Sequence, residues 1–292
     1  MLFRSPFGPF VNKNHYAGWM LMGIPVALGL LAGTLERHVP LLPPGFRNRL
    51  LWLSTPSGGH VLLIAFGVVL MSVALLMTAS RSGLGCLLLT LVLSGVLAKQ
   101  SLGSRTTRVL LIATGFLLLI AVSVWIGDDS VMKTFGSRPD SVQLRLDIWR
   151  DALTIVRASP LVGTGLNTFG TATLLYQTSV PGLHFQEAHN DYLQLLAEGG
   201  LVLAIPVVVA IVALGFRIVG RFKTPHDDPA VYWIRVGATV GLIAIGLQSL
   251  VEFSLQMPGN AAVCTLLVAI ALHRPARVKG RGATGPMEQR TD

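Results

Sequence analysis

Residues 201–219, LVLAIPVVVAIVALGFRIV, form an apolar run, and they directly follow the polar stretch HNDYLQLLAEGG at 189–200. An α-helix needs about 20 mostly apolar residues to cross the hydrocarbon core of a bilayer. Polar side chains gathered on a loop beside a rigid scaffold are more often functional than structural. This boundary therefore predicts a membrane helix with a candidate site at its edge.

The whole chain has the composition of a membrane protein. Of its 292 residues, 52% are hydrophobic and only 13% are charged, whereas a soluble domain carries about 25% charged residues. The apolar runs predict an all-α polytopic membrane protein with about seven transmembrane helices. They lie at 17–35, 61–79, 84–98, 109–127, 200–219, 233–251 and 260–272. The third and the last are short, and we expect them to be tilted or re-entrant.

The net charge of +9 is explained by membrane topology rather than by a nucleic-acid partner. If the loop 128–199 lies outside, fifteen of the 23 Lys and Arg residues fall on inside segments, which are 36–60, 99–108, 217–235 and 273–292. Inside loops are enriched in Lys and Arg by the positive-inside rule. We therefore predict a membrane domain over 1–272 with one large helical extracytoplasmic loop, 128–199. The basic cytoplasmic tail, 273–292, is predicted to be disordered.

The outside loop contains a predicted amphipathic helix that begins near Asp140 or Ser141 and ends before Pro160. Its apolar residues recur at a 4-3-4-3 spacing, so they share one face of a helix. That stripe comprises Val142, Leu146, Trp149, Leu153 and Val156. We expect it to lie along the membrane surface or to cover the spans.

The same loop ends in a second predicted helix. It should start near His189 or Asn190 and stop at Gly199 and Gly200, because glycine commonly ends helices. A Gly-rich turn at 163–170 separates the two helices.

Arg81 is the most informative cation, because it lies between two apolar runs and close to the membrane. An arginine there is costly unless it reaches the interface or is paired. It is therefore either a membrane-surface anchor or a clamp for a phosphate or diphosphate, which suits the planar guanidinium. Ser80 and Ser82 could add hydroxyl donors to such a clamp.

Arg145 and Arg150 on the first loop helix could add positive charge to the same site. Asp147 and Asp151 lie close in sequence, so both arginines could equally form ordinary surface ion pairs. The sequence leaves these alternatives open.

His189 is the candidate general base, because a histidine side chain has an unperturbed pKa of about 6.5. A capping or packing histidine is the alternative. Asn190 and Asp191 are good helix-cap residues first and candidate ligands second. Glu187 is an alternative base two residues upstream.

No metal and no cofactor are expected. The spacing of His184, Glu187 and His189 does not match the HExxH pattern of zinc sites. Cys86 and Cys264 lie singly in predicted spans, which favours packing over metal binding or a disulfide.

Five segments together resemble the O-antigen ligase and O-antigen polymerase family of bacterial membrane glycosyltransferases. They are PFVNKNHYAGW at 9–19, TASRSG at 78–83, RLDIWRDALTIVRASPLVGTGLNTF at 145–169, HNDYLQLLAEGG at 189–200 and VEFSLQMPGN at 251–260. Each segment alone is a weak signal, but their order and spacing over residues 9–272 are typical of the family.

The resemblance implies transfer of a glycan from a polyprenyl-diphosphate carrier to an acceptor hydroxyl, as in lipopolysaccharide biosynthesis. The reaction would occur at the periplasmic face of the bacterial inner membrane, with 128–199 periplasmic, and the acceptor would be a lipid, a protein or another glycan. By this resemblance Arg81 and Arg145 would bind the donor diphosphate, with Arg150 as an alternative, and His189 would be the base. Asn14, in the first segment, would support the site.

The resemblance also implies that an N-terminal set of spans is missing, since members usually have ten or more. Two other classes of function remain. A transporter for an anionic or lipid-linked solute predicts charged residues within spans and broken helices. A non-catalytic scaffold predicts that replacing Arg81 or His189 has no effect.

Overall fold

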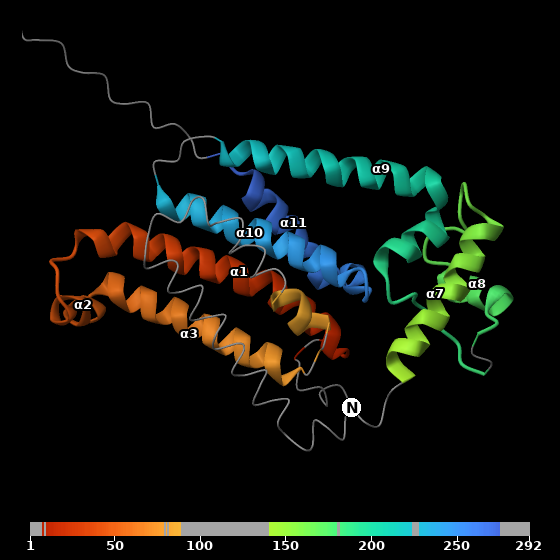
Figure 1. Ribbon diagram of the computed structural model, residues 1–292, viewed down its shortest axis with the longest axis horizontal. Coiled ribbons are helices and arrows are strands. Elements are labelled where there is room, and N and C mark those ends of the chain that lie inside the picture. Colours follow the sequence, from red (N-terminus) through yellow and green to blue (C-terminus); the bar gives the residue numbers. More distant parts are fainter. Residues whose placement is uncertain are drawn as a thin grey trace, which may run out of the picture.

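The computed structural model describes residues 8, 10–78, 80, 82–88, 140–179, 182–223 and 228–274. Within these ranges all regular elements are helices, and four of them are long and apolar enough to cross a membrane (Figure 1). The four are α1 (Lys13–His38), α3 (Pro56–Met77), α9 (Asp191–Phe222) and α10 (Pro229–Gln248). The remaining elements are η1 (Val39–Leu41), α2 (Phe46–Leu53), α7 (Asp140–Ala158), α8 (Phe169–Tyr176), η2 (Ser254–Gln256) and α11 (Pro258–Leu272).

The four long helices correspond to the predicted spans 17–35, 61–79, 200–219 and 233–251, with earlier starts. The last predicted span forms α11, which has only 15 residues. Residues 82–88, at the start of the third predicted span, are helical, and the fourth, 109–127, lies outside the described residues.

Polar caps explain why the helices begin before their apolar runs. Asn12, Thr55 and Asp228 each accept a hydrogen bond from a backbone N–H in the first turn of α1, α3 and α10. The first N–H groups of a helix have no intrahelical partner, so such side chains determine where the helix starts. Hydropathy alone does not detect these caps.

α1 and α10 pack antiparallel with their backbones in contact, along a set of residues that we call the glycine seam: Gly29, Gly33, Gly237 and Gly241. A Cβ atom at Gly29 would overlap the carbonyl oxygen of Trp233, and one at Gly237 would overlap that of Pro25. Between membrane helices, such close approach replaces the hydrophobic driving force that lipid does not supply. The seam therefore sets which residues of α1 meet which residues of α10.

One end of the bundle collects residues from three segments that were predicted to lie inside. Arg37 donates to Asp228, and Trp233 donates to Glu36 at 2.5 Å. The hydrogen bond from Arg37 is the main cause that holds the pKa of Asp228 below its ordinary value. Arg235 donates to the carbonyl of residue 273 at 2.8 Å. The opposite end carries the start of α1, the end of α10 and the start of α9.

α7, α8 and the first part of α9 form a separate helical layer at this opposite end (Figure 1). Its core differs from the predicted apolar stripe. α7 buries Ile148, Ala152 and Ile155, whereas Leu146 and Leu153 of the predicted stripe are 40% and 42% exposed. α7 therefore has apolar residues on two faces, and α8 and α9 cover mainly the face beside the predicted stripe, although Val156 of the stripe packs against the same core.

α9 bends sharply at Gly200, whose backbone lies at φ 58° and ψ −164° (Figure 1). The predicted glycine stop is therefore a bend, after which the helix continues. The turn at 160–165 supplies the missing hydrogen bonds on both sides of it. N–H groups of the turn reach the carbonyls of Ala197 and Glu198, and its carbonyls accept from Leu201 and Val202, at 2.9–3.1 Å.

We predict that Gly237→Ala destabilises the protein by about 1–3 kcal/mol, because the added methyl group separates the two backbones. Gly67→Ala is the matched control, since a Cβ at Gly67 of α3 meets nothing within 4 Å. It should leave stability unchanged or raise it by up to about 1 kcal/mol. Unfolding in detergent measures both variants, and equal stabilities would contradict a tight seam.

We call the layer of α7, α8 and the first part of α9 the outer layer. We also predict that Gly200→Ala loosens it. Its Cβ would overlap Leu161 of the turn, and the backbone conformation at Gly200 is strained for any residue with a side chain. Limited proteolysis should then cut within 160–190 faster than in the wild type. Gly215→Ala in the same helix is the control, because nothing lies within 4 Å of that position. Wild-type resistance of Gly200→Ala would show that the bend does not hold the layer.

Candidate functional site

Glu252 lies between α10 and η2, at the centre of a cluster of polar side chains. The cluster is at the end of the bundle where α1 starts and α10 ends, which we call the outer end. The Glu252 side chain is 0% exposed. Oε1 accepts hydrogen bonds from Asn14 Nδ2 at 2.6 Å and from the Arg145 guanidinium, and Oε2 lies 3.4 Å from His189 Nδ1. A buried carboxylate without such partners would cost several kcal/mol. Three segments far apart in the sequence therefore converge on one buried charge.

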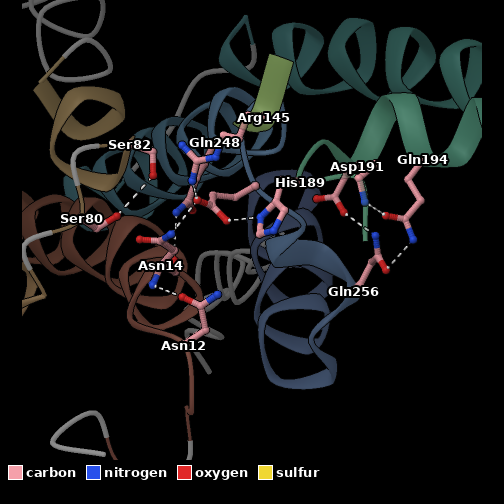
Figure 2. A network of polar contacts seen from close by, with 12 residues as sticks. Asn12, Asn14, Ser80, Ser82, Arg145, His189, Asp191, Gln194, Gln248 and Gln256 are labelled. Atoms are coloured by element: carbon pink, nitrogen blue, oxygen red, sulfur yellow. Dashed lines mark hydrogen bonds and ion pairs between the residues drawn. The ribbon is translucent and has the colours of Figure 1, made fainter. Parts of the chain in front are cut away.

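Figure 2 shows Asn14, Arg145 and His189 pointing toward one another, with Gln248 close by. Asn14 comes from the first turn of α1, Arg145 from α7 and His189 from the loop before α9. Gln248 Nε2 donates to the Asn14 carbonyl at 3.0 Å, which ties α1 to the end of α10. The structure thus brings together three residues that the sequence named separately.

His189 is held firmly although its side chain is 31% exposed. Its φ of 51° is unusual for a residue other than glycine. Hydrogen bonds hold the residues on both sides. The Ala188 carbonyl accepts from Trp149 Nε1, and the Ala188 N–H donates to Gln194 Oε1. Asn190 caps α9. This confirms the capping role that the sequence gave as the simpler one for Asn190. The loop therefore presents the imidazole in one direction.

Phe253 completes the surroundings of the imidazole. Its ring meets His189 edge to face, with centroids 5.0 Å apart, and meets buried His15 of α1 in the same way at 4.5 Å. Two consecutive residues therefore contact the histidine: Glu252 through its carboxylate, and Phe253 through its ring.

The two candidate arginines of α7 have different environments. The Arg145 side chain is 27% exposed and reaches Glu252. Arg150 is 66% exposed and pairs with Asp147 at 2.8 Å, one helical turn away. An exposed pair of this kind contributes little to stability. The geometry therefore favours Arg145 over Arg150 as part of the central group.

Asp191 belongs to the joint between α9 and the segment that carries Glu252. Its carboxylate accepts from the N–H of Leu255 and from Gln256 Nε2, both at 3.3 Å. Its N–H donates to the carbonyl of Ser249 at 2.9 Å. These bonds hold the start of α9 against the end of α10.

Glu187 lies in a neighbouring network rather than at Glu252. Gln194 Nε2 donates to Glu187 at 2.6 Å and to buried Glu198 at 3.2 Å. Burial raises the pKa of the Glu187 carboxyl, and the hydrogen bond from Gln194 opposes this effect. The role of Glu187 as an alternative base stays a prediction.

Ser80 and Ser82 lie beside α1, with their hydroxyl oxygens 3.3 Å apart (Figure 2). Ser80 also accepts from the N–H of Gly83, which packs against Ala17 of α1. Arg81 lies outside the described residues, so its role as a clamp stays a prediction. Among the residues described, no group of three or more His, Cys, Asp or Glu side chains is placed to hold a metal ion.

Residues 66–208 match the family described as O-antigen ligase. Residues 66–208 are an O-antigen ligase domain. The family transfers glycans, by ligase-type or polymerase-type reactions, in the synthesis of membrane polysaccharides, and implies a lipid-linked glycan donor and an acceptor. Its members reside in the inner membrane, in agreement with the membrane-length helices found here. No curated protein matches the chain at a significant level.

The O-antigen ligase match covers Arg81, Arg145 and His189, whereas Asn14 and Glu252 lie outside it. Glu252 lies in VEFSLQMPGN, one of the segments that resemble the family, but it was not predicted to be a site residue. One signal was present: Glu252 is an ionisable residue between two apolar helices, where charged groups are costly and are often functional.

Proposed function

We infer that the chain transfers a glycan from a polyprenyl diphosphate to an acceptor hydroxyl at the periplasmic face of the bacterial inner membrane. The observation that carries this proposal is the meeting of Arg145 and His189 at the outer end of membrane-length helices. Arg145 is a permanent cation that can bind a diphosphate, and His189 is a base that can take the proton of a hydroxyl group.

The proposed reaction is one displacement. His189 takes the proton from the acceptor hydroxyl while that oxygen attacks the anomeric carbon of the donor glycan. The bond from the anomeric carbon to the diphosphate oxygen breaks, and the polyprenyl diphosphate leaves with the electron pair. Arg145, with Arg81 as a second predicted cation, stabilises the charge that develops on the leaving group. The acceptor, whether lipid, protein or glycan, decides between ligation and polymerisation.

The proposed topology places 128–199 in the periplasm, with the basic tail 273–292 in the cytoplasm. The grouping of helix ends supports this arrangement, because Arg37 and Arg235 lie at the end opposite His189. The short basic segments at that end satisfy the positive-inside rule.

We predict that His189→Ala lowers the rate of glycan transfer by about 100- to 10,000-fold, since a general base contributes that much. Binding of the lipid-linked donor should be spared, because the base acts on the acceptor. Purified protein in detergent, with a polyprenyl-diphosphate oligosaccharide and an acceptor, measures both quantities. Full transfer by His189→Ala would exclude its role as the base.

Arg145→Ala should weaken donor binding about 10-fold or more, the usual effect of losing a hydrogen bond between charged groups. Arg150→Ala should have a much smaller effect, because Arg150 pairs with Asp147 away from Glu252. Arg157→Ala is the matched control: it removes the same charge from an exposed position in the last turn of α7. Equal losses in all three variants would indicate general attraction of an anion rather than a clamp.

A further inference from the structure

We propose that Glu252 is a positioning residue that fixes which nitrogen of His189 carries the proton and holds Arg145 beside it. This inference rests on the proposed function, because it assigns Glu252 a part in the same transfer reaction. It is carried by the contacts and burial of Glu252, which lies outside the segment that matches the family.

The Glu252 carboxylate is 0% exposed, and among the described residues its side-chain partners are Asn14, Arg145 and His189. An ionised group in such a place is unfavourable unless the surrounding donors compensate it. A hydrophobic residue would fill this position without that cost, so packing alone does not account for a glutamate here.

The hydrogen bond between Glu252 and His189 can have only one direction. A carboxylate only accepts, so the ring nitrogen that faces it, His189 Nδ1, must carry a proton. In a neutral imidazole the other nitrogen, Nε2, then keeps its lone pair. That is the arrangement a general base needs, and a third group that orients the base is a recurring part of such sites.

The Glu252 carboxylate also contacts the cation, Arg145. Oε1 accepts from Arg145 while Oε2 faces His189, so one side chain fixes the distance between the donor clamp and the base. One N–H of a guanidinium is used in this contact, and the fork has five. Arg145 therefore retains donors for a diphosphate.

Other titratable groups surround His189 as well. They are His15 of α1, Glu187 in the same loop, Asp191 at the start of α9 and Arg145 of α7. All of them remain when Glu252 alone is replaced, so an effect of that replacement is assigned to Glu252.

The test is Glu252→Gln, which keeps the shape of the side chain and removes its charge. Its amide N–H can donate to His189 Nδ1, which favours the ring with the proton on Nε2 instead. We expect kcat to fall by about 100-fold or more. Donor affinity should also fall, but by less than in Arg145→Ala, because Arg145 remains and loses only the carboxylate that holds it. The acidic limb of the rate profile should also differ from that of the wild type, because His189 loses the carboxylate that faces it.

Glu198→Gln is the matched control. Glu198 is also a buried carboxylate in the outer layer, but it accepts from the N–H groups of Asn167 and Phe169 and does not contact His189. Its replacement should lower thermal stability and leave the rate profile in place. The same profile shift in Glu198→Gln and Glu252→Gln would mean a general structural effect and would overturn the proposal.

A second readout does not depend on transfer. In ¹⁵N-histidine spectra, with His189 assigned from the His189→Gln variant, the wild type should show a protonated Nδ1, and Glu252→Gln should lose that preference. Should Glu252→Gln fail to fold, Glu252→Asp keeps the charge but shortens the reach. It should lose rate while the acidic limb stays near that of the wild type.

The outcomes separate the two proposals. If His189→Ala is inactive but Glu252→Gln has the wild-type rate, profile and spectrum, Glu252 is not a positioning residue and the proposed function stands. If the wild type transfers no glycan, the proposed function fails, and the nitrogen spectrum alone decides whether Glu252 holds His189.

Discussion

The close contact between α1 and α10 is the constraint on which the rest of the structure depends. Glycines at matching positions let the two backbones touch, so the helices can pack in only one register. That register places Asn14 at the first turn of α1 against Gln248 at the end of α10, and Glu252 one turn beyond. A shift by one helical turn, about 5.4 Å, would separate these groups. The polar centre therefore exists because the apolar helices fit without side chains between them.

The buried carboxylate of Glu252 then joins the membrane helices to the outer layer. α7 and the loop before α9 contribute Arg145 and His189, and both reach the same side chain. A charge that is costly to bury makes the correct assembly of these segments more favourable than any partial one. Arg145 and His189, the proposed cation and base, are thus ordered by one group from outside the residues that match the O-antigen ligase family.

The sequence was most reliable where a signal is local. Apolar runs located the four long helices of the described residues. The polar stretch before Gly200 located the start of α9 and its bend. It failed where the cause is tertiary. α9 continues past Gly200 because the turn at 160–165 satisfies the groups at the break, which no local pattern reveals. Glu252 has no partner near it in sequence, so only the fold identifies its role. The seam left a readable trace, since Gly29 and Gly33, like Gly237 and Gly241, are four residues apart.

The bend in α9 has a mechanical consequence. Four backbone hydrogen bonds from the turn at 160–165 bridge it, two on each side, and glycines at 163 and 200 allow the chains to touch there. A bend held in this way is a rigid elbow rather than a hinge, because straightening it would break all four bonds together. The outer layer cannot swing as a lid over His189 by motion at this point. The elbow therefore fixes the position of the His189 imidazole relative to the membrane-length part of α9.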